Sequence, residues 1–196
     1  AEALMAQDHI TTRREVAIFP MLFASTLDMC PLPAALQDLH RVIDLRRWSG
    51  LCTIDRGTSV LSRLTGSLMR FPLAGRDVPV TVEMTRQGDK EVWSRTFGRH
   101  RFHSILSRPK SGAGLIERFG ALSFRIALRV DEGQLHYPVV QGWCLGLSLP
   151  RWMLPVSRTV EAVDKQGRAT FDVELSHPLT GLIVRYRGWL VDAATP

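Results

Sequence analysis

The feature that most constrains the fold is a change in hydrophobic period at Pro79. Before this proline, apolar residues recur at helical spacing over about residues 33–46 and again from Ser59 to about residue 71. After it, apolar and polar residues alternate, most regularly over residues 122–130, which predicts strands that bury one face. We therefore predict a mainly β, α+β fold with one or two N-terminal helices.

Turn signals divide the β region into short strands in meander order. Residues 108–114 are predicted to form a loop, and residues 143–155 to be irregular. Eight or nine strands are expected, at about residues 51–56, 80–85, 91–97, 101–106, 122–130, 134–140, 156–164, 168–176 and 183–191.

Such a set of strands must bury one sheet face and protect its edges. We predict an antiparallel curved sheet or a calycin-like barrel, with the helix near residues 58–71 against its open side. A barrel of about eight strands is wide enough for one small ligand. We call this expected shape, a curved sheet around a cavity, a β-cup.

Length and composition limit the domain organisation. The chain has 196 residues and is 45% hydrophobic, which suits one domain. We expect residues 1–30 to be an N-terminal extension and residues 31–196 to be a single β-cup domain. The longest apolar run, residues 16–27, contains a proline and is too short to span a bilayer. The three cysteines have no CxxC spacing, which favours a reducing, cytoplasmic location.

The formal charge of +6 raises the question of a nucleic-acid partner. The basic residues are almost all arginines, and they are spread along the chain rather than clustered in a stripe or a reader motif. We therefore expect no nucleic-acid partner.

Several sequence blocks together resemble the bacterial family called domain of unknown function 4166. Their order and spacing cover about residues 22–190. The blocks are residues 32–40, 78–82, 93–98, 117–120, 142–143, 171–173 and 182–190. The family often stands C-terminal to a saccharopine-dehydrogenase-like domain, so the resemblance implies an NAD(P)-dependent reductase as a partner. It implies no chemistry for this domain itself.

Motifs for nucleophilic catalysis, phosphate binding and dinucleotide binding are absent from the sequence, so no cofactor is expected. His100 and His103 would point to opposite faces of a strand, which argues against a metal site. The other histidines, His40 among them, are isolated along the chain and are interpreted as surface or packing residues.

Arginines within the alternating pattern are the most informative polar residues. Arg95 shares a strand face with Trp93 and Phe97, and Arg56 shares one with Ile54. An unpaired charge inside an apolar cavity would cost several kcal/mol. The neutralising group for these arginines is either an acidic ligand or an internal carboxylate, for which the candidates are Glu117, Asp55 and Asp172. Alternatively, this side of the strand faces outward and aromatic side chains lie over it.

The leading hypothesis is a small-molecule binding domain that holds a hydrophobic ligand with an acidic group in the β-cup, accessory to an oxidoreductase. The alternative is a cofactor-independent isomerase, cyclase or dehydratase in which Glu117 or Asp55 is the general base. A third hypothesis is a weak membrane contact by the helix that starts at Ser59. The predicted ligand-binding residues are Arg56, Trp93, Arg95, Phe97, Arg118, Trp143, Tyr186 and Arg187. Trp143 and Trp152 form either a lid over the cup or a plain surface loop.

Overall fold

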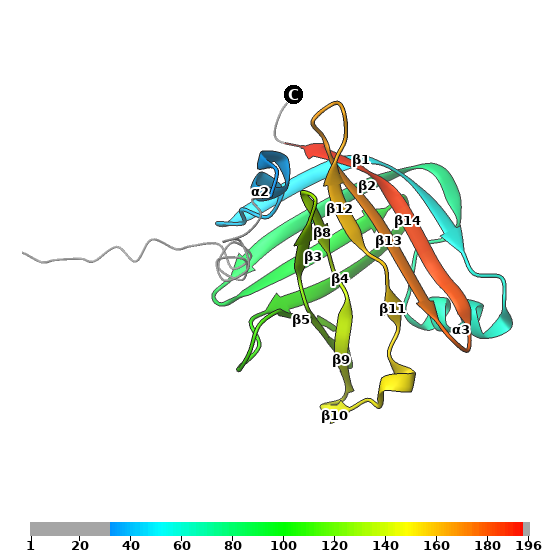
Figure 1. The fold of residues 1–196 in the computed structure, drawn as a ribbon. Helices are drawn as coiled ribbons and strands as arrows, with labels where there is room; N and C mark the ends of the chain where they lie inside the picture. The colour runs from blue at the N-terminus through cyan, green and yellow to red at the C-terminus, as the bar shows by residue number, and fades with distance from the viewer. Residues whose placement is uncertain (1–31, 194–196) are drawn as a thin grey trace, which may run out of the picture.

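The computed structural model describes residues 32–193, and the predicted extension over residues 1–30 lies outside this part of the chain. One antiparallel sheet dominates the fold (Figure 1). Two α-helices, α2 (Ala34–Leu39) and α3 (Val60–Leu68), and a 3-10 helix, η1 (Arg151–Met153), accompany it. The strands are β1 (Leu45–Arg56), β2 (Gly75–Gln87), β3 (Lys90–Phe97), β4 (His100–Ser107), β5 (Leu115–Phe119), β6 (Leu122–Ile126), β7 (Arg129–Asp131), β8 (Gln134–His136), β9 (Val139–Cys144), β10 (Leu147–Ser148), β11 (Val156–Ser157), β12 (Val160–Val163), β13 (Ala169–His177) and β14 (Gly181–Asp192).

The strand order of the sheet is β10-β9-β6-β5-β4-β3-β2-β1-β14-β13-β12-β8-β7, with β11 also paired to β13. The mainly β, antiparallel prediction is confirmed. The expectation of eight or nine strands is wrong, since the sheet has 14, and the ladder of the described residues does not close into a barrel. β5 and β10 were not predicted. The strands predicted at residues 122–130, 134–140 and 156–164 are each split in two, as β6 and β7, β8 and β9, and β11 and β12.

A long hairpin over residues 122–144 explains two of these splits. Its strands break at residues 127–128 and 137–138, where Pro138 has no N–H to donate and its carbonyl accepts from Ala127 N. Before the break, β6 pairs with β5; beyond it, β8 pairs with β12. The same hairpin therefore contacts strands near both ends of the order, and the sheet curls strongly around its concave face (Figure 1).

α2 is shorter than the predicted helix over residues 33–46. Its apolar residues Leu36 and Leu39 are buried as the periodicity indicates, but the helix ends at Leu39, and Ile43 is exposed. From Leu45 onward the chain pairs with β2 and then also with β14, because extended backbone there completes two ladders. α2 contacts β12 and β13 and lies at the opposite end of β1 from α3 (Figure 1).

α3 begins where predicted, since the Ser59 side chain accepts a hydrogen bond from Ser62 N at 3.1 Å and caps the helix. Its apolar side does not pack on the sheet. The small residues Ser62 and Gly66 are buried instead, and Ser62 Oγ donates to Leu182 O at 2.6 Å. Leu64 and Leu68 of α3 therefore face away from the sheet.

The core lies on the concave face, where alternate residues of each strand point inward. Phe124, Ile126 and Leu128 are buried as predicted. On β14, Tyr186 points inward and Arg187 outward. Gly188 marks a close approach, because a Cβ at this position would collide with the carbonyl oxygen of Leu51.

Candidate functional site

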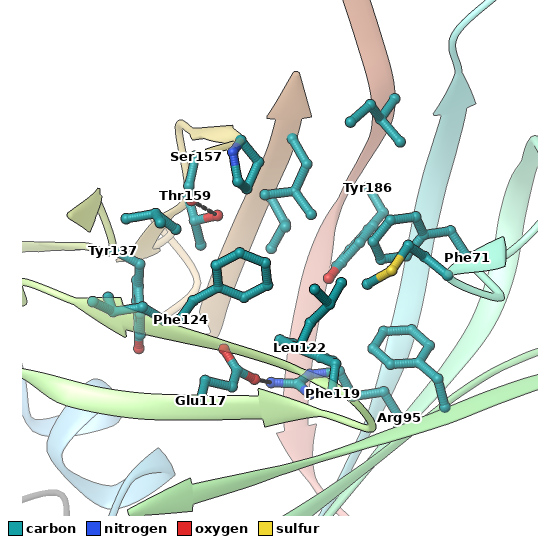
Figure 2. Close-up of a pocket in the computed structure, with 18 of the residues that line it drawn as sticks. Phe71, Arg95, Glu117, Phe119, Leu122, Phe124, Tyr137, Ser157, Thr159 and Tyr186 are labelled. Atoms are coloured by element: carbon teal, nitrogen blue, oxygen red, sulfur yellow. Dashed lines mark hydrogen bonds and ion pairs between the residues drawn. The ribbon is translucent and has the colours of Figure 1, made fainter. Parts of the chain in front are cut away.

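A cavity of about 560 Å³ lies on the concave side of the sheet. Leu39 of α2, Leu61 of α3 and Trp152 of η1 are among the residues that line it. Figure 2 shows aromatic and aliphatic side chains that point into the space from several strands. Its volume is in the ordinary range for small-molecule sites.

Aromatic rings make up much of the cavity wall. Phe97 packs edge-on against Tyr186, with ring centroids 5.0 Å apart, and stacks on Phe102 at 5.8 Å. These rings come from β3, β4 and β14, which the alternating pattern turns toward the same space. The other phenylalanines that line the cavity are Phe71, Phe119, Phe124 and Phe171.

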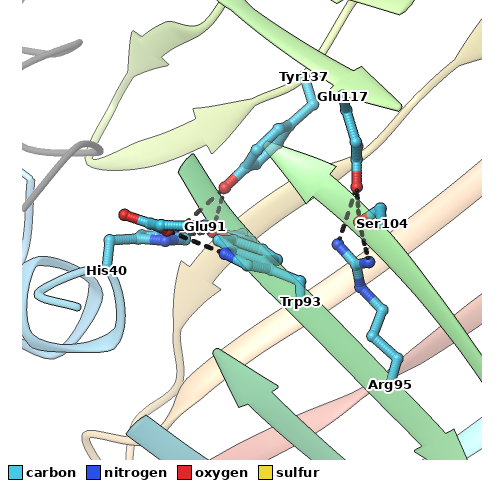
Figure 3. Close-up of polar contacts among 8 residues, drawn as sticks. His40, Glu91, Trp93, Arg95, Ser104, Glu117 and Tyr137 are labelled. Atoms are coloured by element: carbon cyan, nitrogen blue, oxygen red, sulfur yellow. Dashed lines mark hydrogen bonds and ion pairs between the residues drawn. The ribbon is translucent and has the colours of Figure 1, made fainter. Parts of the chain in front are cut away.

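Three adjacent strands place a charged cluster on this wall. Arg95 on β3 donates to Ser104 Oγ on β4 at 2.8 Å and to Glu117 Oε1 on β5 at 3.1 Å. Ser104 Oγ also donates to Glu117 Oε1, at 2.7 Å (Figure 3). The Arg95 guanidinium lies 5.0 Å from the ring centroid of Trp93 and 5.6 Å from that of Phe102. Of the three predicted internal partners, Glu117 is the one that neutralises Arg95.

A second polar cluster lies where α2 meets the sheet. Tyr137 donates to Glu161 Oε2 at 2.6 Å, and His40 Nε2 lies 2.6 Å from the same oxygen. Tyr137 and Glu161 line the cavity, whereas His40 is buried behind them and stacks on Trp93 at 5.6 Å. Trp93 Nε1 in turn donates to the buried Glu91 at 2.9 Å (Figure 3).

Burial governs the ionisation of both tyrosines. It raises the pKa of Tyr137 well above its ordinary value, and the charge and hydrogen bond of Glu161 raise it further. Burial likewise raises the pKa of Tyr186 to about 12, although the charge of Arg95 acts in the opposite direction. Both hydroxyls are therefore neutral donors at physiological pH.

Sequence reasoning missed the second cluster. His40 was interpreted as a surface or packing residue, and neither Tyr137 nor Glu161 was a candidate. The one signal in the sequence was Glu161, an acidic residue inside the short apolar strand β12. Its partners His40 and Tyr137 lie 121 and 24 positions away along the chain. Tyr137 is placed by the break in the long hairpin, where its N–H donates to Thr159 O.

Five predicted site residues line the cavity: Trp93, Arg95, Phe97, Glu117 and Tyr186. The other five lie elsewhere. Asp55 and Arg187 form an ion pair at 3.4 Å on the outer face of the sheet. Arg118 donates to Gly120 O in a turn, and Trp143 is outside the lining. Of the two predicted lid tryptophans, only Trp152 lines the cavity.

Arg56 points inward, as predicted, but serves the backbone. Its guanidinium donates to Phe71 O at 2.9 Å and to Pro72 O at 3.0 Å, and burial lowers the pKa of this group. These bonds hold the segment that follows α3. They leave Arg95 as the arginine that lines the cavity.

Within residues 32–193, no group of three or more His, Cys, Asp or Glu side chains could hold a metal ion. Cys52 and Cys144 are free thiols, and burial raises the pKa of Cys52 to about 11. No helix in this same stretch is both long enough and apolar enough to cross a membrane.

The fold and the cavity define a curled antiparallel sheet around a mostly apolar site. A family model described as "Domain of unknown function (DUF4166)" matches residues 32–190. The chain belongs to this family. A search of curated proteins found no match.

Proposed function

We propose that this domain binds an apolar small molecule in the β-cup and orients it through a polar group held by Arg95 and its neighbours. The observation that carries the proposal is the cavity of about 560 Å³, whose wall is mostly aromatic and aliphatic and holds two small polar clusters, one around Arg95 and Glu117 and one around Tyr137 and Glu161. A few polar groups in an apolar wall are typical of sites that fix a ligand's orientation.

The polar group of the ligand follows from the hydrogen bonds of Arg95. A guanidinium has five N–H donors, and the bonds to Ser104 and Glu117 account for two of them. The remaining donors can bind a carbonyl or carboxyl oxygen. An ionised ligand carboxylate would meet the negative charge of Glu117, so an undissociated acid or a carbonyl fits this site better than the free anion expected from sequence.

The cluster of His40, Tyr137 and Glu161 favours a second candidate function, a cofactor-independent isomerase, cyclase or dehydratase. Glu161 lines the cavity and lies 2.6 Å from both an imidazole nitrogen and a phenol oxygen, an arrangement that suits general acid–base catalysis. Asp55 is no longer a candidate base for this cavity, because it lies on the outer face of the sheet. Glu117 lines the cavity and stays a candidate.

Binding is tested by native mass spectrometry of freshly purified protein, followed by titration with dodecanoic acid and with its methyl ester. Leu122→Trp fills the cavity, since Leu122 points into it (Figure 2). Ser123→Trp is the matched control on the opposite face of the same strand. The proposal requires that the wild type and Ser123→Trp bind at least one probe and that Leu122→Trp binds neither. Equal binding by all three proteins, or by none, would contradict it.

Turnover is separated from carriage by incubating the loaded protein in heavy water. A catalysed proton transfer would introduce deuterium into the ligand, and Glu161→Gln would abolish this exchange. Unchanged ligand mass favours carriage alone. The reductase partner implied by the family resemblance and the cytoplasmic location expected from the cysteines stay proposals alongside this one.

A further inference from the structure

Exposed apolar side chains surround the open end of the cavity. We call six of them the mouth rim: Leu61, Leu64, Leu68, Trp152, Met153 and Leu179. Leu68 is 84% exposed, Leu179 70% and Trp152 67%. Monomeric proteins rarely expose such a group of large apolar residues at one place unless something binds there.

Hydrogen bonds join the three segments that carry the rim residues. Ser59 Oγ donates to Thr180 O at 2.7 Å and ties α3 to the β13–β14 turn. The ring of His177, the last residue of β13, lies 2.8 Å from Trp152 O and ties this end of β13 to η1. Leu61, Trp152, Met153 and Leu179 also line the cavity, so the rim forms its entrance.

The orientation of α3 supports a partner for this surface. A surface helix normally turns its apolar stripe toward the core, but α3 buries Ser62 and Gly66 and exposes Leu64 and Leu68. Its sequence would not favour this arrangement in water alone. An apolar environment outside the protein would stabilise it.

The charges beside the rim indicate what this environment is. Residues 57–73, 142–157 and 175–184 form the segments at this end, and they contain Arg63, Arg70 and Arg151 but no Asp or Glu. An anionic surface would meet no repulsion there and would attract the three arginines. An acyl chain leaving a bilayer at this point would pass from lipid into an apolar cavity without crossing water.

We infer that the mouth rim docks on an anionic lipid bilayer and that the β-cup takes its ligand directly from it. The inference rests on the proposed function for the ligand, but the docking itself does not require a loaded cavity. Leucines and a tryptophan bury in the interfacial region while arginines pair with lipid phosphates. The sequence predicted a weak membrane contact by α3 alone, whereas the mouth rim is built from α3, η1 and the β13–β14 turn.

Co-sedimentation with vesicles tests the docking. We expect the wild type to sediment with vesicles of phosphatidylcholine and phosphatidylglycerol and to bind pure phosphatidylcholine more weakly. The L64S/L68S double variant should bind about tenfold or more weakly. The matched control is I43S/L45S, which removes two exposed apolar residues near α2 and should bind as the wild type does. Replacing Arg63 and Arg151 with Gln should weaken binding to the anionic vesicles about tenfold.

Failure of the docking is distinguishable from failure of the proposed function. Neither Leu64 nor Leu68 lines the cavity, so L64S/L68S should still bind dodecanoic acid or its methyl ester in the absence of vesicles. The inference is overturned if the wild type stays in the supernatant with both vesicle types, or if L64S/L68S sediments as the wild type does. It is also overturned if size-exclusion chromatography shows a dimer that L64S/L68S dissociates, because a second copy would then cover the rim.

Discussion

Arg95 and Glu117 form an ion pair on the inner wall of the cavity, with 3.1 Å between Nη2 and Oε1. The pair exists because β4 lies between β3 and β5 and contributes Ser104, which bonds to both side chains. Each partner neutralises the other in an apolar setting. The cavity therefore tolerates an arginine without a bound anion.

We predict strong coupling between these two residues. Arg95→Met or Glu117→Gln alone should each lower the free energy of unfolding by about 3 kcal/mol, because each leaves a buried charge without its partner. The double variant should cost clearly less than the sum of the two. Urea denaturation of the four proteins gives the coupling energy, and additive costs would show that the pair does not act as a unit.

Arg187→Met is the control for this cycle. Its ion pair with Asp55 lies on the outer face, where water screens it. Exposed pairs contribute at most about 1 kcal/mol, so this variant should unfold nearly as the wild type does.

Phe124 and Arg125 test the register of β6. Phe124 is buried and lines the cavity. Phe124→Ala should therefore lower the free energy of unfolding by about 3 kcal/mol. This is the lower end of the range for such a change, because part of the ring faces open space. Arg125→Ala removes hydrogen bonds to Ser111 O and Ala113 O at the edge of a loop and should cost about 1 kcal/mol or less. Equal denaturant midpoints for the two variants would contradict the register.

The alternating pattern predicted the sheet because burial of one face imposes a period of two on any strand long enough to show it. Residues 122–128 and 183–190 are such cases. The strand count could not be predicted, because β7, β8, β10 and β11 have only two or three residues each. Their pairing is decided by neighbours that lie far away in the sequence.

Residues of the site could be predicted only where they lie on the same face of a single strand. Trp93, Arg95 and Phe97 share a face of β3, and that face turned out to line the cavity. The pairing of His40 with Glu161 joins α2 to β12 across 121 positions, and no local pattern encodes it. The orientation of α3 could not be predicted for a related reason: helical periodicity shows that one side is apolar but not which side meets the sheet.

Because the tyrosines are buried, we expect the free energy of unfolding to fall in alkali. The chain has two tyrosines, both buried; the pKa of Tyr186 is raised to about 12 from about 10 in an unfolded chain. The folded state holds this proton more tightly, so the stabilisation is fully present below pH about 10 and is lost as pH rises through about 12. Two pKa units correspond to about 3 kcal/mol.

Tyrosinate absorbance should therefore stay low in the folded protein past pH about 10 and rise together with unfolding. Tyr186→Phe should flatten the decline in the free energy of unfolding over the same range. Normal tyrosine titration with an intact circular-dichroism spectrum would show that the two hydroxyls are not buried in solution.

α3 packs against Arg56 through Gly66. Replacing a helical glycine with alanine normally stabilises a helix by about 1 kcal/mol, but a Cβ on Gly66 would collide with the Arg56 guanidinium. That group is held by the carbonyls of Phe71 and Pro72 and cannot move without losing both bonds. Gly66→Ala should therefore lower the free energy of unfolding by about 1 to 2 kcal/mol. In an Arg56→Ala background the same change should become stabilising, and exposed Ser67→Ala should be neutral or stabilising in both backgrounds. Stabilisation by Gly66→Ala in the wild type, measured by urea denaturation, would show that Arg56 does not fix the position of this helix.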